Sequence, residues 1–198
     1  MVNSNKIRIL DNMKDTKINN VFTLGVREPQ PNDKRVSYSQ YTMYANCAHE
    51  WKLNYMDGFG TFDPSIHLVF GTAMHETLQE WLDVLYNKSP KEATELDLGK
   101  MLYESMVTEY KKMREQTGVE FSTPSEMEEF LEDGINILNF VTKNRLDYFN
   151  TRHMKLVAIE LPIYSKAMES HNVYMMGFLD LVFEDTYENK LQIWDIKT

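Results

Sequence analysis

The sequence predicts an α+β fold in which helices pack on one face of a small mixed β-sheet. Three observations support this prediction. Apolar residues recur at helical spacing between residues 39 and 149, the period changes to strand-like alternation after residue 155, and the helices precede the strands instead of alternating with them. With 198 residues, of which 42% are hydrophobic and 26% charged, the chain can form one domain with a real core.

The predicted helices follow an N-terminal arm, residues 1–36, whose weak periodicity allows one short strand. Ser39 is placed to cap a helix that runs to about Tyr55, before Asp57 and Gly58 break it. Further amphipathic helices are expected over residues 71–87, 95–115 and 125–149. The first of these has the clearest apolar stripe: Met74, Leu78, Trp81, Leu82 and Leu85.

Three strands are predicted after the helices, over Leu156–Tyr164, Tyr174–Glu184 and Leu191–Lys197. Pro162 confines the first strand to a sheet edge or a bulge, because proline lacks the amide proton that a sheet requires. A hairpin-length connection joins the second strand to the third. We therefore expect one domain over residues 37–198, with a helical part (37–150) and a sheet part (155–198).

The net charge of −9 is unevenly distributed. Residues 92–133 carry 12 acidic and 4 basic side chains, whereas residues 1–55 carry 8 basic and 5 acidic ones. We expect the acidic block to be a solvated helical face. Because the rest of the chain is nearly neutral, the overall charge does not exclude a nucleic-acid partner.

The chain has a single cysteine, Cys47, and no stretch with the character of a membrane span or a secretory signal. One cysteine cannot form an internal disulfide, which agrees with a reducing compartment. We expect a soluble, cytoplasmic protein with no membrane partner. Cys47 is expected to be buried on its helix, as lone cysteines usually are.

Two aspartates are predicted to face each other in the C-terminal hairpin. Both common loop lengths place Asp180 directly opposite Asp195, where side chains are ~4.5–5.5 Å apart and like charges are destabilising. Lys197 falls on the same face by strand alternation. A cation such as Mg²⁺ or Mn²⁺ would offset the repulsion, and this set favours phosphodiester hydrolysis. The alternative is a solvent-facing group in which Lys197 is only a salt-bridge partner.

Four short motifs occur in order along the chain: Ser37-Tyr-Ser39, Gly71-Thr-Ala-Met-His75, Gly177-Phe-Leu-Asp180 and Asp195-Ile-Lys197. They resemble the S-x-S, G-x-x-x-H, G-x-x-D and D-x-K motifs of the PD-(D/E)xK nuclease superfamily, in its RecB-like exonuclease branch. The resemblance covers residues 37–198 and implies a restriction-endonuclease-like core that is truncated after the catalytic strand.

The resemblance also implies roles for individual residues. Four of them would bind Mg²⁺ or Mn²⁺: His75, Asp180, Asp195 and, through its backbone carbonyl, Ile196. Lys197 would be the catalytic lysine, and Glu160 resembles an acidic residue often present on the preceding strand. The alternatives are a packed or surface histidine at position 75 and an ordinary strand glutamate at position 160.

The implied function is that of a metal-dependent DNA exonuclease in recombination, replication or repair, in a bacterium or an infecting phage. One alternative is a catalytically silent scaffold that binds DNA ends or a partner protein, although such a scaffold has no need of the carboxylate pair. Another is a hydrolase that uses Asp180 and Asp195 as glycosidases use their carboxylates. Lys197 beside the pair argues against the glycosidase.

The sequence also departs from the branch pattern. The branch continues after D-x-K with a Q-x-x-x-Y helix and a further strand, so we expect a C-terminal continuation or a second polypeptide to complete the domain. We expect the 198 residues alone to cleave DNA poorly. Some members hold an iron–sulfur cluster; Cys47 is placed like its first ligand, and the other cysteines would have to lie outside this chain.

Overall fold

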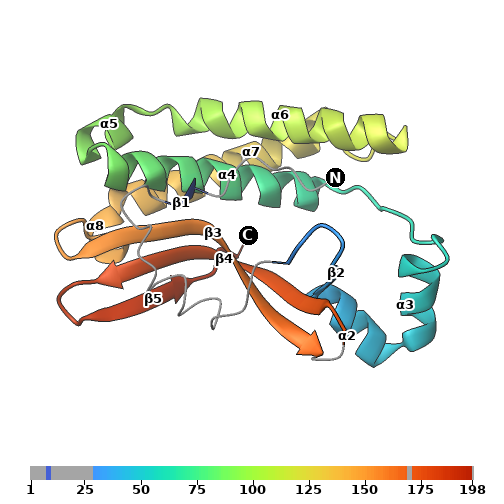
Figure 1. Ribbon diagram of the computed structural model, residues 1–198. Coiled ribbons are helices and arrows are strands. Elements are labelled where there is room, and N and C mark those ends of the chain that lie inside the picture. The colour runs from blue at the N-terminus through green and yellow to red at the C-terminus, as the bar shows by residue number, and fades with distance from the viewer. Residues whose placement is uncertain (1–7, 10–28, 169–170, 198) are drawn as a thin grey trace. The chain divides into compact units, whose positions relative to one another are not determined.

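The structure is a computed structural model that describes residues 8–9, 29–168 and 171–197 (Figure 1). Its helices are α2 (Tyr38–Asn46), α3 (Ala48–Tyr55), α4 (Ile66–Asn87), α5 (Pro90–Glu95), α6 (Leu98–Thr117), α7 (Pro124–Lys143) and α8 (Arg145–Tyr148). Its strands are β1 (Arg8–Ile9), β2 (Lys34–Ser37), β3 (Met154–Met168), β4 (Val173–Asp185) and β5 (Lys190–Trp194). No helix in the described ranges is long and apolar enough to cross a membrane.

The strands form one mixed sheet in the order β1-β3-β4-β2, and β5 pairs with β4. β1 runs antiparallel to β3, with Arg8 opposite Ile159. β2 runs parallel to β4, and its last residue, Ser37, lies opposite Met176. Helices together with a mixed sheet confirm the predicted α+β class.

The chain divides into two compact units. The first contains the described residues up to Thr61 together with Val157–Val182 and Ile193–Asp195. The second contains Phe62–Leu156, Phe183–Gln192 and the described residues from Ile196 onward. β3, β4 and β5 therefore contribute residues to both units, and Asp195 and Ile196 are bonded neighbours assigned to different ones.

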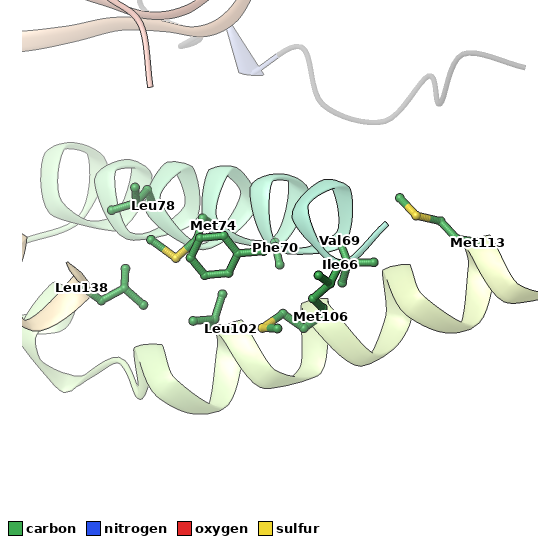
Figure 2. Close-up of a cluster of buried hydrophobic side chains, with 10 residues drawn as sticks. Ile66, Val69, Phe70, Met74, Leu78, Leu102, Met106, Met113 and Leu138 are labelled. Atoms are coloured by element: carbon green, nitrogen blue, oxygen red, sulfur yellow. The ribbon is translucent and has the colours of Figure 1, made fainter. Parts of the chain in front are cut away.

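The core of the second unit is formed by α4, α6 and α7, as Figure 2 shows. Its buried members are Ile66, Val69, Phe70, Ala73, Met74, Leu78, Leu102, Met106, Met113 and Leu138. This confirms that the predicted stripe of α4 is core. The helix starts earlier than predicted, because Ser65 accepts a hydrogen bond from the Leu68 amide and caps it.

Gly134 allows α7 to pack closely against the other two core helices. A β-carbon at this position would lie 2.4 Å from Leu102 Cδ2 and 3.0 Å from Phe70 Cε2. Such distances are too short for any larger side chain without movement of its neighbours. The absence of a side chain at Gly134 is therefore a packing requirement.

The helix predicted from Ser39 to Tyr55 is two helices, which corrects that prediction. Cys47 has an extended backbone between α2 and α3, and its sulfur accepts a hydrogen bond from the Glu50 amide. Ser37, rather than Ser39, caps α2 by accepting from the Gln40 amide. Cys47 is exposed, so the expectation that it is buried was also wrong.

The later helices also end at different residues from those predicted. The helix expected over 125–149 ends at Lys143, and Asn144 separates α7 from α8. The short helix α5 was not predicted; Ser89 accepts a hydrogen bond from the Glu92 amide at its start, and Pro90 occupies its first turn. Local capping groups, which periodicity does not detect, determine these ends.

Two strands differ from the prediction in length. β3 spans 15 residues and includes Pro162, which is tolerated close to an irregularity: Glu160 has a φ of 53°. β5 ends at Trp194, although the strand was predicted to reach Lys197. The turn between β4 and β5 spans residues 186–189, one of the predicted loop lengths.

Thr123 begins α7 with a capping box: its hydroxyl accepts from the Glu126 amide, and the Glu126 carboxylate accepts from the Thr123 amide. We expect Thr123→Ala to lower the free energy of unfolding by about 1 kcal/mol, because the Glu126 amide loses its partner. Urea denaturation measures this change. Thr108→Ala is the control, since that hydroxyl donates only to a carbonyl of its own helix; an equal loss in both variants would contradict the capping role.

Candidate active site

Glu160 of β3 and Asp180 of β4 form a carboxylate pair within the first unit. Both side chains are half-buried, and their nearest ligand oxygens lie within 4.8 Å of each other. Like charges at this separation repel each other. An ordinary sheet gains nothing from such a pair, whereas a bound cation would be attracted to both oxygens.

The backbone of Glu160 supports a functional role for this pair. Its φ of 53° lies in the left-handed region, which non-glycine residues rarely occupy. A backbone held in this conformation lowers the stability of the fold by about 1–3 kcal/mol, and such residues cluster at functional sites. The irregularity also interrupts the alternation of β3 and so changes the direction of the Glu160 side chain.

Asp195 and Lys197 lie beyond the end of β5, and both are exposed. Asp195 directly follows the strand in the first unit, and Lys197 belongs to the second. Because β5 ends at Trp194, strand alternation does not extend to these two residues, and their placement on one face stays a prediction. The predicted pairing of Asp180 with Asp195 would require β5 to include Asp195, and the strand ends one residue earlier.

His75 is joined to the D-x-K segment within the second unit. Its Nε2 donates a hydrogen bond to the backbone carbonyl of Ile196, with a nitrogen–oxygen distance of 2.9 Å. The Ile196 side chain packs against the helical core. This contact ties the segment after β5 to helix α4.

The turn between β4 and β5 is held by Asp185, a residue that sequence reasoning missed. Its Oδ1 accepts hydrogen bonds from the amides of Tyr187 and Glu188, and its Oδ2 accepts one from the Gln192 side chain. The bond from the Glu188 amide, chiefly, holds the pKa of the Asp185 carboxyl below its usual range. Aspartate at the start of a turn is a known signal for this arrangement.

A model of the PD-(D/E)XK nuclease superfamily matches residues 35–198. The chain belongs to this superfamily. All four motifs of the sequence analysis lie within the matched range. A comparison with curated proteins finds no match.

The oxygen-rich donor set suits the divalent metals that PD-(D/E)XK nucleases use. Carboxylates and backbone carbonyls are hard ligands, which favour Mg²⁺ and Mn²⁺ over softer metals. The structure brings Glu160 to Asp180 in one unit and His75 to Ile196 in the other. The sequence analysis named all four of these residues but predicted neither of the two contacts between them.

Proposed function

We propose that the chain is a Mg²⁺- or Mn²⁺-dependent deoxyribonuclease of the RecB-like branch, an exonuclease that acts in recombination, replication or repair in the cytoplasm. The observation that carries the proposal is the half-buried pair of Glu160 and Asp180 inside the superfamily match. We further propose that residues 37–198 are the nuclease domain.

Five residues are proposed to hold the cation: His75, Glu160, Asp180, Asp195 and, through its carbonyl, Ile196. Repulsion within the pair of Glu160 and Asp180 supports a cation there. Asp195 is bonded to Ile196, whose carbonyl is already engaged by His75. Binding a metal through Nε2 requires His75 to give up that hydrogen bond and to carry its proton on Nδ1.

The chain's own groups have separate tasks in the proposed hydrolysis. A bound cation would polarise the phosphate and acidify a water molecule. The Lys197 ammonium would stabilise negative charge on the phosphate or hold the attacking water, because it is a compact charge with three donors. Asp185 fixes the turn between β4 and β5 by accepting from the amides of Tyr187 and Glu188.

The direct test incubates the purified chain with end-labelled linear DNA and with circular DNA, in Mg²⁺, Mn²⁺ or EDTA. An exonuclease shortens linear DNA from its ends with either cation, leaves closed circles intact and is inactive in EDTA. Cleavage of closed circles would exclude the exonuclease assignment. Binding of DNA ends without cleavage would favour the silent scaffold instead.

Replacing His75 separates a ligand from a packed histidine. We expect His75→Ala to reduce cleavage at limiting Mn²⁺ about tenfold or more while the melting temperature changes little, since ligand-supporting groups affect metal affinity on this scale. Titration of Mn²⁺ in the cleavage assay measures the effect. His67→Ala is the matched control on the same helix, where the ring is exposed and contacts Phe130. Loss of folding with unaltered metal affinity would contradict the ligand role.

A further inference from the structure

Helices α2 and α3 carry an exposed set of aromatic side chains that the proposed chemistry does not use. Tyr38 is 72% exposed, and Tyr41 and Tyr44 are each 54% exposed. Neither helix contributes a buried residue. These tyrosines therefore do not belong to a hydrophobic core in the described part of the chain.

The aromatic residues follow one another along α2 and α3, and ring contacts join the last three of them. Tyr38, Tyr41 and Tyr44 recur at every third position of α2, which places successive residues ~4.5 Å apart along the helix axis. The ring of Trp51 on α3 then packs edge-on to Tyr44, with centroids 5.4 Å apart, and Tyr55 follows at 6.2 Å. We call these five residues the aromatic strip.

The surroundings of the strip favour an anionic ligand. Residues 34–49, which include all of α2, contain Lys34 and Arg35 but no aspartate or glutamate, in a chain whose net charge is −9; the α3 part of the strip contains one acidic and one basic residue, Glu50 and Lys52. Lys34 and Arg35 are both exposed and lie on β2, directly before the first tyrosine. The first turn of α2 also lacks acidic residues, so nothing there opposes the positive end of its dipole.

The strip begins close to the candidate site within the same unit. β2 leads directly into α2 and runs parallel to β4, with Ser37 opposite Met176 (Figure 1). Asp180 lies four residues further along β4, a distance of ~13 Å at the usual strand rise. A flexible strand of nucleic acid that reaches Asp180 could therefore also reach Tyr38.

We propose that the aromatic strip stacks the bases of a single-stranded stretch of DNA whose backbone passes Asp180. This inference rests on the proposed nuclease function and names its substrate as single-stranded. Exposed aromatic rings with adjacent cations are typical of surfaces that bind single strands, because every base offers a face for stacking. A nucleic acid is favoured over a protein partner by the exposed cations Lys34 and Arg35, because the phosphate groups of DNA attract them.

The test measures binding of labelled oligothymidylate to the full chain by fluorescence anisotropy in EDTA, where metal-dependent cleavage does not occur. Tyr41→Ala and Tyr44→Ala should each raise Kd about fivefold or more, the usual effect of losing one stacked base. Tyr41→Phe and Tyr44→Phe should bind like the unchanged chain, because the ring is kept. Tyr103→Ala is the matched control, being 54% exposed on α6.

Three results would overturn the inference: unchanged Kd in both alanine variants, an equal loss in Tyr103→Ala, or equal effects of the variants on single-stranded and blunt duplex DNA. A change of oligomeric state on gel filtration in the alanine variants would instead identify the strip as a contact between copies of the chain. Duplex cleavage by Tyr41→Ala with an unchanged Kd would refute the strip and leave the nuclease proposal intact. Absence of cleavage by the unchanged chain, together with a melting temperature that Mn²⁺ does not change and with stacking confirmed, would refute the nuclease proposal and leave the strip intact.

Discussion

Replacing Asp180 by asparagine is expected to reduce metal-dependent DNA cleavage by at least ~10²–10³-fold, the scale on which loss of one charge-stabilising group lowers turnover. Asparagine keeps the shape of the side chain and a coordinating oxygen, but it removes the negative charge that the cation requires. The rate of release of labelled nucleotides in Mg²⁺ measures the loss. Single-stranded DNA binding in EDTA should be retained, which separates catalysis from binding.

The same substitution should also change the response of the fold to metal. A cation at ~100 times its Kd stabilises a protein by about 2.7 kcal/mol, or ~5–11 °C for a chain of this size. The unchanged chain should show such a rise in Mn²⁺, because the cation relieves the repulsion between Glu160 and Asp180. Asp180→Asn should lose most of it.

Glu184→Gln is the matched control for Asp180→Asn. It removes one negative charge from the same strand, where Glu184 forms a 3.2 Å ion pair with Lys155. We expect its cleavage rate and its metal response to match those of the unchanged chain. An unchanged melting temperature in Mn²⁺ for the unchanged chain, or full activity of Asp180→Asn, would refute the proposed metal site.

The second large effect is expected at Gly134, where alanine should destabilise the helical core. Alanine favours a helix over glycine by ~0.8–1.0 kcal/mol, yet its β-carbon would lie 2.4 Å from Leu102 Cδ2. Overpacking of this kind costs about 1–3 kcal/mol, which exceeds the gain from helix propensity. Urea denaturation should therefore show a net loss of unfolding free energy.

A double-mutant cycle attributes this loss to the contact. Leu102→Ala alone should cost about 2–5 kcal/mol because Leu102 is fully buried. Combined with Gly134→Ala, the loss should be smaller than the sum by ~0.5–3 kcal/mol, since the new methyl group enters the vacated space. Gly99→Ala is the control: its β-carbon would meet Ile135 at an ordinary 3.5 Å. Additive losses would contradict the steric explanation.

Periodicity predicted the parts of the fold that bury a continuous apolar face. The stripe of α4, the β4 strand and the turn at 186–189 all follow from local patterns that agree with the final packing. The division at Cys47 did not, because neither α2 nor α3 buries a residue and no apolar pattern marks their ends. The ends of helices that are set by single capping hydrogen bonds are difficult to predict from the sequence pattern.

The candidate site was predictable in its residues more than in its geometry. Motif order predicts Asp180, Asp195, Lys197 and His75 as site residues, whereas strand alternation extended β5 too far. The bond from His75 to the Ile196 carbonyl joins residues 121 positions apart, a separation that no local pattern reports. The positive φ of Glu160 is likewise visible only in three dimensions.

Ile196 occupies the position that a D-x-K motif leaves open, yet it is tied to the fold at two points. Its side chain packs against the helical core and its carbonyl is bonded to His75. The middle position of the motif can therefore vary only among apolar residues, and its place in the fold is fixed. A polar residue here would weaken the packing that holds the backbone between Asp195 and Lys197, so the proposed site would lose its geometry with every other motif residue intact.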